Sequence, residues 1–278
     1  MRRVGAAALA TGLQTSDNVR VTTTHDVSAP DLDNFARLVD QLCAERTVLD
    51  AGQLVASYAG QSPPGLQGRR LVFTFDDGLL SSFDAAQSIL NPRGIKAIFF
   101  IPTMVLDLTT PEQMQAFFRQ NVYRRAPEHL PPDRYMTMAA EHILELRDQG
   151  HVVAPHTHSH VSLRSLTTPA DIDRELRSPK LRLEDMLQRS VDAFAFPVGT
   201  ERVVSPIAYE AIRRLYSVCF TGIGGVNTAK TDPYYLYRDS VHPYYEATHV
   251  ANVTAGSYDL FYQYKMRKLK RRVRLPAA

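Results

Sequence analysis

Apolar or β-branched runs of strand length recur along the chain, and they alternate with segments whose apolar residues lie three or four positions apart. The strand-length runs cover residues 19–24, 71–75, 97–101, 152–154, 193–196 and 218–220. The segments with helical spacing cover residues 35–42, 81–90, 138–149, 170–188 and 206–216. Runs that are apolar at nearly every position are typical of parallel strands covered on both faces. Their alternation with helices predicts an α/β fold.

Four further elements are predicted, namely a strand at 47–49, a helix at 53–58, a strand at 235–238 and a helix at 258–272. Ser178-Pro179 is expected to divide the helix at 170–188, because proline has no N–H to donate inside a helix.

Residues 103–135 interrupt this alternation. The segment mixes Met, Phe and Tyr with Arg and Pro, and it is longer than an ordinary connection between elements, so it predicts a lid or binding loop. With no internal repeat and no low-complexity linker, we expect one domain over residues 1–264, followed by a basic tail at 265–278.

Composition narrows the class of protein. In 278 residues, 44% are hydrophobic and 22% are charged, which excludes a disordered chain. Cys43 and Cys219 are too few for a disulfide framework and are expected to be reduced thiols. No apolar run reaches the ~20 residues that a membrane-spanning helix needs.

The net charge of +3 comes from the tail, where seven Lys and Arg residues lie between Lys265 and Arg274. Without them the chain has 25 basic and 29 acidic residues, so nothing in the body predicts binding to nucleic acid. The cations alternate with Met266, Leu269 and Val273, which predicts a short amphipathic helix that docks on anionic lipid or an acidic glycan. The alternative is a solvated terminus.

The amino terminus bears on localisation. Residues 1–10 only faintly resemble a signal peptide, since their apolar stretch is short and rich in alanine. We therefore expect a cytoplasmic protein held at the inner membrane face, with a periplasmic or exported protein as the alternative. The sequence does not indicate an oligomeric state.

Chemistry-bearing residues gather where predicted strands end. Asp76 and Asp77 directly follow the run at 71–75, although such a pair can also cap a helix or form a turn. Three of the nine histidines lie in His156-Thr157-His158-Ser159-His160, directly after the run at 152–154. Imidazoles at i and i+4 can reach one metal ion, and a nearby carboxylate completes a two-histidine, one-carboxylate set.

The order of three motifs resembles the polysaccharide deacetylases, also called the NodB-homology domain or carbohydrate esterase family 4. The motifs are T-F-D-D-G at 74–78, G-H-x-V-x-x-H-T-x-S-H at 150–160 and F-x-F-P-x-G at 194–199. The segment 175–184 is also similar to the family, and the likeness runs from about Val19 to His242. The resemblance implies a distorted (β/α) barrel with its site at the carboxyl ends of the strands, where barrel enzymes hold their sites.

The resemblance also implies roles for individual residues. Asp77, His156 and His160 would bind one divalent metal ion, most often Zn²⁺, and Asp76 would be the general base. The activity implied is hydrolysis of N-acetyl groups of amino sugars in a polysaccharide or glycan precursor. Pro197, Gly199 and His158 are further candidates for binding the substrate or orienting the site, with a solvent-facing role for His158 as the alternative.

The general acid is where the chain departs from the common pattern. Most members carry a late histidine in a Leu-rich context, and His242 is only a loose match. Thr24-His25-Asp26-Val27 instead resembles the Y-H-D-V of the circularly permuted branch, which includes deacetylases of poly-N-acetylglucosamine. In that branch the late strand lies at the front of the chain. His25 is therefore the favoured acid and His242 the alternative.

Two other departures concern the surroundings of the base. Ala195 stands where many members have an arginine that pairs with the base, and the chain has no Trp for the usual pocket wall. Arg238 is a candidate replacement for that arginine, and a surface position is its alternative reading.

Two other functions remain open from the sequence: an amidohydrolase acting on a small non-polymeric amide, and a non-catalytic carbohydrate-binding protein. The intact set of Asp76, Asp77, His156 and His160 favours an enzyme, because binding alone needs no base beside a metal ligand.

Overall fold

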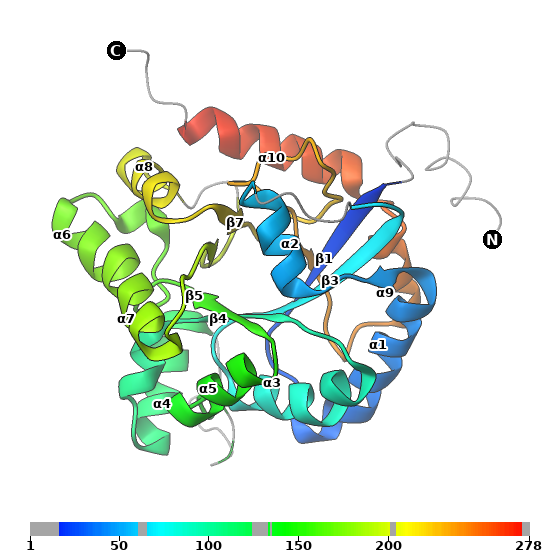
Figure 1. Cartoon of the computed structure of the whole chain (residues 1–278), viewed down its shortest axis with the longest axis horizontal. Coiled ribbons are helices and arrows are strands. Elements are labelled where there is room, and N and C mark those ends of the chain that lie inside the picture. The colour runs from blue at the N-terminus through cyan, green and yellow to red at the C-terminus, as the bar shows by residue number, and fades with distance from the viewer. Residues whose placement is uncertain (1–16, 61–65, 124–132, 134, 201–203, 274–278) are drawn as a thin grey trace.

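The expected apolar runs form the parallel strands at the centre of the molecule (Figure 1). The computed structural model describes residues 17–60, 66–123, 133, 135–200 and 204–273. The eight described strands are β1 (Asn18–Thr24), β2 (Thr47–Val48), β3 (Arg69–Phe75), β4 (Ile98–Ile101), β5 (Val152–Pro155), β6 (Ala193–Ala195), β7 (Val218–Phe220) and β8 (Asp239–Ser240). Strands β1, β4, β6 and β7 are buried along their whole length, as expected for a sheet covered on both faces.

The helices surround these strands (Figure 1). They are α1 (Leu32–Glu45), α2 (Ala51–Tyr58), α3 (Leu80–Ala85), α4 (Pro111–Phe117), α5 (Ala140–Asp148), α6 (Pro169–Ile172), α7 (Ser178–Leu187), α8 (Pro206–Leu215), α9 (Ala247–Thr254) and α10 (Asp259–Val273). Amphipathic α1 buries Phe35, Leu38, Val39 and Leu42, the positions whose spacing predicted a helix there. Helix α9 was not predicted from the sequence.

The strands form two parallel sheets that together make an open ring. The larger sheet has the order β5-β4-β3-β1-β8, with β2 paired to β3, and the smaller sheet pairs β6 with β7. Phe220 of β7 also makes a single parallel bridge to Leu236, so the chain that leads into β8 connects the smaller sheet back to β1. This arrangement agrees with the α/β, distorted (β/α) barrel that the sequence predicts.

The last strand lies later than expected. The sequence predicts a strand at 235–238, whereas the ladder to β1 is formed by Asp239 and Ser240. Leu236 bonds to β7 through the Cys219 carbonyl, at 2.9 Å, and the chain then crosses to β1. The segment changes partner between residues 236 and 239, so neither ladder is long enough to match the expected strand.

The long helix at 170–188 continues through the proposed division. Residues 173–177 form a π-helical turn, η8, between α6 and α7, and Pro179 lies in the first turn of α7. Proline is tolerated there because the first N–H groups of a helix have no partner inside the helix. The helix therefore does not break at Ser178-Pro179. It changes there from the π-helical turn η8 to the α-helix α7.

The described part of the long segment 103–135 packs on the barrel. It contains the 3-10 helix η5 (Thr103–Asp107), α4 and a π-helical turn, η6 (Phe118–Val122). Phe117 and Phe118 are 5% and 0% exposed. Residues 124–132 and 134 lie outside the described residues, and the lid expected here stays a prediction.

Two buried guanidinium groups tie the end of the chain to its beginning. Arg20 of β1 is 1% exposed, and its two terminal nitrogens lie 2.7 Å from Asp239 and 2.6 Å from Asp259. Arg238 in turn forms an ion pair with Asp76 of the loop after β3.

The boundary expected at residue 264 falls inside α10. Met266 and Leu269 of that helix are buried against Ile223 and Tyr235. Residues 1–10, which only faintly resemble a signal peptide, lie outside the described residues.

Candidate active site

Asp76 and Asp77 lie at the carboxyl end of β3, in the centre of the ring. Both are buried, and the Asp76 N–H donates to the Thr24 carbonyl of β1 at 3.1 Å. Asp77 and Gly78 both have left-handed backbone, with φ of 73° and 69°. That conformation is costly for a residue other than glycine and is common where a side chain is held for function. The turn brings the Asp77 carboxylate against the loop of residues 156–160, which carries the histidines and is called the histidine loop below.

His156 and His160 follow β5 and converge on Asp77. They are 1% and 8% exposed, and Thr157 and His160 also have left-handed backbone. The His160 Nε2 lies 3.2 Å from Asp77 Oδ1, and the His156 Nε2 lies 3.9 Å from the same oxygen. One ligand atom from each of the three residues lies within 4.8 Å of the others. The ends of β3 and β5, 80 residues apart in the sequence, thus supply the three side chains of one buried cluster.

The hydrogen bonds around this cluster fit a divalent cation. The Nδ1 of His156 lies 2.9 Å from the Ala195 carbonyl, and the Nδ1 of His160 lies 3.0 Å from the Asn121 carbonyl. A carbonyl accepts only, so each Nδ1 carries a proton and each Nε2 is the atom that faces the cluster as a metal ligand. Within the described part of the chain, the buried Asp77 Oδ1 receives no hydrogen bond of normal geometry. Two imidazoles and one carboxylate form a facial donor set for zinc or another first-row metal ion.

Electrostatics keep His156 neutral and Asp77 ionised, which are the protonation states that a metal ligand needs. Burial lowers the pKa of His156 to about 4, so this imidazole is neutral at pH 7. Burial opposes ionisation of Asp77, but its pairing with protonated His160 outweighs burial, holds the pKa of Asp77 well below its usual range and raises the pKa of His160. The carboxylate is therefore ionised at neutral pH. A metal ion bound here would take the place of the proton on His160 Nε2.

The long segment 103–135 supplies two contacts that sequence reasoning missed. The Tyr123 hydroxyl donates to Asp77 Oδ2 at 3.1 Å, and Asn121 provides the carbonyl that orients His160. Asn121 also donates from its side chain to the Ser159 carbonyl at 3.0 Å. The Asn121 contact uses a backbone carbonyl, which every residue type has, so no sequence signal could have found it. The Tyr123 contact had one weak signal, because a tyrosine in a long inserted segment is a candidate for a contact with the site.

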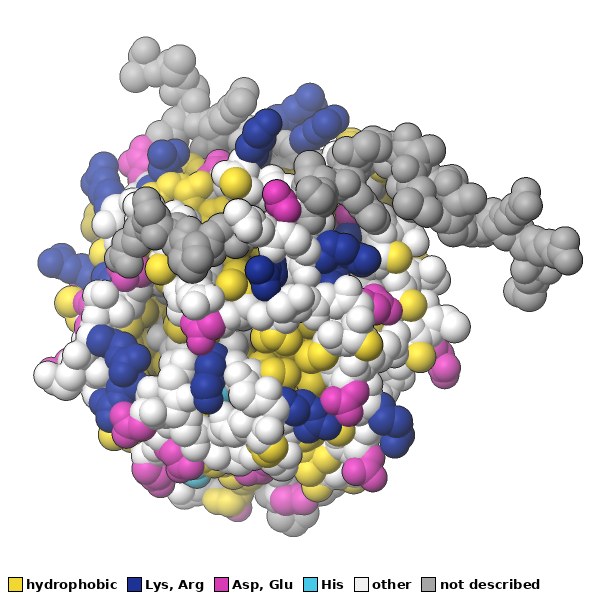
Figure 2. Space-filling model, turned by 45° about the vertical axis from the view of Figure 1, so that its right-hand side comes forward, with side chains coloured by type: hydrophobic (Ala, Val, Ile, Leu, Met, Phe, Trp, Pro, Cys, Tyr) yellow, Lys and Arg dark blue, Asp and Glu magenta, His cyan; other side chains and the backbone are white. Residues whose placement is uncertain are grey.

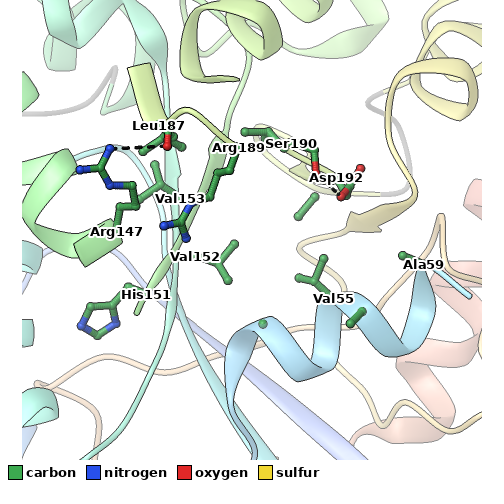
Figure 3. Close-up of a pocket in the computed structure, with 14 residues that line it drawn as sticks. Val55, Ala59, Arg147, His151, Val152, Val153, Leu187, Arg189, Ser190 and Asp192 are labelled. Carbon is green, nitrogen blue, oxygen red and sulfur yellow. Dashed lines mark hydrogen bonds between the residues drawn. The ribbon is translucent and has the colours of Figure 1, made fainter. Parts of the chain in front are cut away.

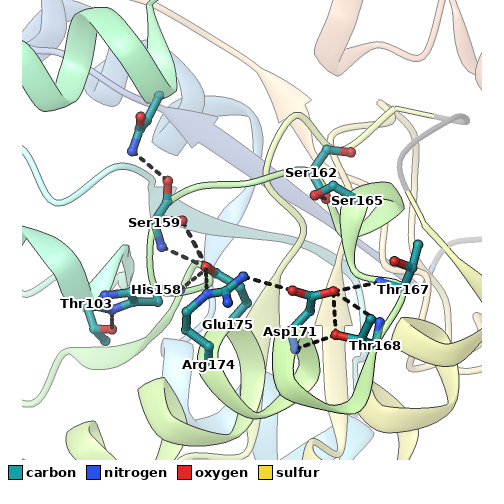
Figure 4. Close-up of polar contacts among 11 residues, drawn as sticks. Thr103, His158, Ser159, Ser162, Ser165, Thr167, Thr168, Asp171, Arg174 and Glu175 are labelled. Atoms are coloured by element: carbon teal, nitrogen blue, oxygen red, sulfur yellow. Dashed lines mark hydrogen bonds and ion pairs between the residues drawn. The ribbon is translucent and has the colours of Figure 1, made fainter.

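Glu175 holds the histidine loop from below (Figure 4). This side chain from η8 is 2% exposed and accepts from the backbone N–H groups of His158 and Ser159 at 3.1 and 3.0 Å. It also accepts from the Ser159 hydroxyl at 3.0 Å. The His158 ring lies 3.1 Å from the Thr103 hydroxyl and does not join the cluster of metal-ligand candidates. Charge-assisted bonds of this kind fix the loop that carries His156 and His160.

Arg238 pairs with Asp76 through two hydrogen bonds. Its Nη1 and Nη2 donate to the two carboxylate oxygens at 2.6 and 2.8 Å, and its Nε donates to the Thr221 carbonyl at 2.8 Å. Burial opposes ionisation of Asp76, but the Arg238 guanidinium outweighs it and holds the pKa of that carboxyl below its ordinary value. Arg238 is 2% exposed, so the structure excludes a surface position for it. Asp76 is thus an ionised carboxylate beside the cluster, with Oδ2 3.8 Å from His156 Nε2.

His25 and His242, the two candidates for the acid, stack on each other. Their ring centroids are 5.3 Å apart, and the Tyr244 ring continues the stack at 5.1 Å from His242. Within the described residues the buried Nδ1 of His25 has no hydrogen-bond partner, whereas the Nε2 of His242 lies 3.1 Å from the Ser240 hydroxyl. Burial, together with His25, lowers the pKa of His242 to about 4. The outer ring of this column, Tyr244, is 66% exposed.

Pro197 and Gly199 shape the loop after β6. A Cβ added at Gly199 would lie 2.2 Å from the backbone nitrogen of Gly222, so only glycine fits this close approach. The Gly222 N–H donates to the Gly199 carbonyl at 2.8 Å. Pro197 is buried, whereas Val198 between them is 60% exposed. The hydrogen bond between Gly222 and Gly199 joins the loop after β6 to the loop after β7.

A separate hollow of about 240 Å³ lies at the opposite end of the strands (Figure 3). It is bounded by Val55 of α2 and Ala59 directly after that helix, by Val152 at the start of β5 and by Asp192 just before β6. These are the amino ends of the strands, so this hollow takes no part in the chemistry of the Asp–His cluster.

Comparison with known proteins agrees with the geometry. The family model described as polysaccharide deacetylase matches residues 65–212. No curated protein matches the sequence. The chain is similar in structure to the Streptococcus pyogenes deacetylase PplD, solved in complex with acetate, with a TM-score of 0.66, 17% identity and coverage of 86% of this chain and 99% of that one. It is also similar to IcaB from Ammonifex degensii, with a TM-score of 0.63, 21% identity and coverage of 86% and 96%. A de-N-acetylase from Aggregatibacter actinomycetemcomitans matches with a TM-score of 0.60, 15% identity and coverage of 85% and 100%.

Proposed function

Because this chain belongs to the polysaccharide deacetylase family, we propose that it removes acetyl groups from N-acetylated amino sugars of a polysaccharide or glycan precursor. In this proposal Asp77, His156 and His160 hold one divalent metal ion, most often zinc, and Asp76 is the general base. The single observation that carries the proposal is the ionised Asp76 carboxylate lying directly beside a buried cluster of three convergent metal-ligand candidates.

Hydrolysis of the amide requires a base close to the water that attacks the acetamide carbonyl. When bound, a divalent cation supplies Lewis-acid polarisation of the carbonyl and lowers the pKa of the water. Asp76 accepts the water proton on a carboxylate oxygen as the new C–O bond forms. Arg238 keeps that carboxylate ionised and fixed in orientation in the resting enzyme, and Asp76 must release the proton taken from water before the next turnover. Cleavage of the C–N bond then requires a proton for the leaving amine.

His25 is the proposed donor of that proton. The pKa of about 4 for His242 supports this choice, because that imidazole is neutral at pH 7 and a neutral imidazole is a poor proton donor. His242 stacks on His25 and is the proposed positioning residue that fixes its ring. In this arrangement the column His25–His242–Tyr244 leads from the reacting bond to an exposed aromatic ring.

The exposed ring of Tyr244 supports a carbohydrate substrate. The C–H face of a sugar ring is apolar and packs on an aromatic face, while its hydroxyls remain in water. Tyr244 is 66% exposed although large and aromatic. Since the chain contains no Trp, Tyr244 is the proposed replacement for the usual aromatic wall of the pocket.

Separate substitution of the two histidines distinguishes their roles. His25→Ala is expected to reduce cleavage of an N-acetyl substrate by about 100-fold or more, because the amine is a poor leaving group without a proton. The same variant is expected to retain much of its activity on an activated acetate ester, whose leaving group needs little help. His242→Ala is expected to cost much less on the amide. The opposite ranking of the two variants would assign the acid to His242 instead.

The proposed function is tested by measuring acetate release from a panel of substrates, with and without added zinc. The panel comprises N-acetylglucosamine polymers and oligomers, peptidoglycan fragments and small acetamides. The proposal expects release from at least one glycan, lost on chelation and restored by metal. Release from small acetamides alone would favour the amidohydrolase, and glycan binding without release would favour the carbohydrate-binding protein.

A further inference from the structure

Helix α10 presents two different faces. Its inner face packs on the body through Met266 and Leu269, which are 2% and 1% exposed, and the Lys270 ammonium lies 3.5 Å from Asp232 and 4.8 Å from the Tyr235 ring centroid. Two of the three apolar residues that the sequence assigns to a lipid-facing side therefore face the protein instead. The side chain of Val273, the third, lies outside those described.

The outer face of α10 is apolar in its first two turns. Leu260, Phe261 and Tyr264 are 62%, 57% and 64% exposed, and Tyr258, just before the helix, is 39% exposed. Among the described residues seven large hydrophobic side chains are exposed, and four of the seven lie in this stretch. Isolated exposed apolar residues are ordinary, but a contiguous group of them marks an interaction surface.

The next turns of the same face are basic. Arg267 and Arg271 are exposed and Lys268 is half-buried, and at 100° per residue all three follow the strip begun by Leu260 and Tyr264. No Asp or Glu occurs in residues 260–278. In Figure 2, Lys and Arg side chains gather at the upper edge of the molecule, where Figure 1 shows α10. We call Leu260, Phe261, Tyr264, Arg267, Lys268 and Arg271 the α10 strip.

We propose that the α10 strip docks the protein on an anionic lipid surface. Leu260, Phe261 and Tyr264 enter the boundary between headgroups and acyl chains, and Arg267, Lys268 and Arg271 pair with lipid phosphates. Apolar and aromatic side chains beside cations are the arrangement that suits this boundary, where hydrocarbon and anionic headgroups meet within one helix diameter. Among the described residues, no helix is both long and apolar enough to cross a bilayer.

The charge of the rest of the chain supports a lipid occupant. Apart from the seven cations between Lys265 and Arg274, the sequence has 25 basic and 29 acidic residues, a formal charge of −4. An anionic bilayer repels the rest of the chain, with its formal charge of −4, and attracts α10. The protein is therefore expected to approach the bilayer with the α10 strip facing it. This proposal does not depend on the reaction proposed above.

Point substitutions test the strip more sharply than a truncation. Deleting residues 265–278 would also remove the buried Met266 and Leu269 and damage the fold. The first test variant is Phe261→Ser with Tyr264→Ser, and its matched control is Leu181→Ser, at a side chain 53% exposed on α7. The second is Lys268→Glu with Arg271→Glu, and its control is Arg177→Glu with Arg214→Glu, at side chains 64% and 82% exposed on other elements.

Full-length protein is mixed with vesicles of phosphatidylcholine alone or with phosphatidylglycerol added, at low and high salt, and bound protein is measured by flotation. We expect binding only to the anionic vesicles, weakened by salt, and at least about tenfold lower in both strip variants. Both controls should bind like the parent protein, and all variants should keep their thermal unfolding and their turnover of a small soluble substrate.

Three outcomes would overturn the proposal. The first is that the parent protein ignores anionic vesicles at low salt. The second is that the control variants lose as much binding as the strip variants, which would make the attraction one of net charge alone. The third is that the protein forms a dimer in solution that Phe261→Ser with Tyr264→Ser dissociates, without vesicle binding, which would make the strip an interface between copies of the chain.

Discussion

Asp76→Asn is expected to lower the turnover of an N-acetylated glycan by at least about 100-fold while the metal content stays unchanged. An amide has the shape of the carboxylate but cannot accept the water proton, and loss of a general base typically costs 10²–10⁴-fold in rate. Asp76 is not among the three residues whose ligand atoms converge, so the cation site remains complete. The measurements are kcat by acetate release and metal per chain by elemental analysis.

The control for this variant concerns Arg238, which is 2% exposed and bonded to both oxygens of Asp76. Asp76→Asn leaves that guanidinium buried without its counter-charge, and breaking a buried pair in this way typically costs about 3–5 kcal/mol of stability. Turnover is therefore normalised to folded protein. The double variant Asp76→Asn with Arg238→Met removes the unpaired charge, and it should be more stable than the single variant yet equally inactive. Parent-like turnover in Asp76→Asn would reduce Asp76 to a structural partner of Arg238.

His160→Ala is expected to abolish stoichiometric metal binding and, with it, turnover by about 100-fold or more. Three protein ligands are the usual minimum for a catalytic metal site, and removing one leaves His156 and Asp77 with too few donors to hold the ion. Elemental analysis after dialysis, and acetate release with and without added zinc, measure the two effects. His156→Ala should behave in the same way.

His158→Ala is the matched control, because this histidine belongs to the same loop but its ring contacts Thr103. It should keep the metal and most of the turnover. Full metal content in both His156→Ala and His160→Ala would refute the assigned ligand set, and loss of metal in His158→Ala alone would move the site to another part of the loop.

The sequence predicted the parts of the site that depend on strand ends. Asp76 and Asp77 after one apolar run, and His156 and His160 after another, could be expected to meet because parallel strands end at the same edge of a barrel. The apolar character of those runs also located β3, β4 and β5 to within two residues.

The contacts that support the site could not be predicted in the same way. Glu175 lies among the charged residues of 171–177, and the sequence pattern does not distinguish the one buried carboxylate from its exposed neighbours. Asn121 and Ala195 act through backbone carbonyls, which every residue has. Strand β8 was misplaced because its segment divides its hydrogen bonds between β7 and β1, so neither half shows a full strand pattern.

The pairing of β1 with the end of the chain has a consequence for biosynthesis. Ribosomal synthesis delivers β1 first, but the carboxylates that neutralise its buried Arg20 belong to Asp239 and Asp259. The counter-charge of Asp76 arrives equally late, with Arg238. A nascent chain shorter than about 240 residues would therefore bury charges that have no partners, and that cost opposes the pairing of β1 with the rest of the sheet. Arg20 has both of its counter-charges, and Asp76 has its arginine partner, only after synthesis has passed Asp259.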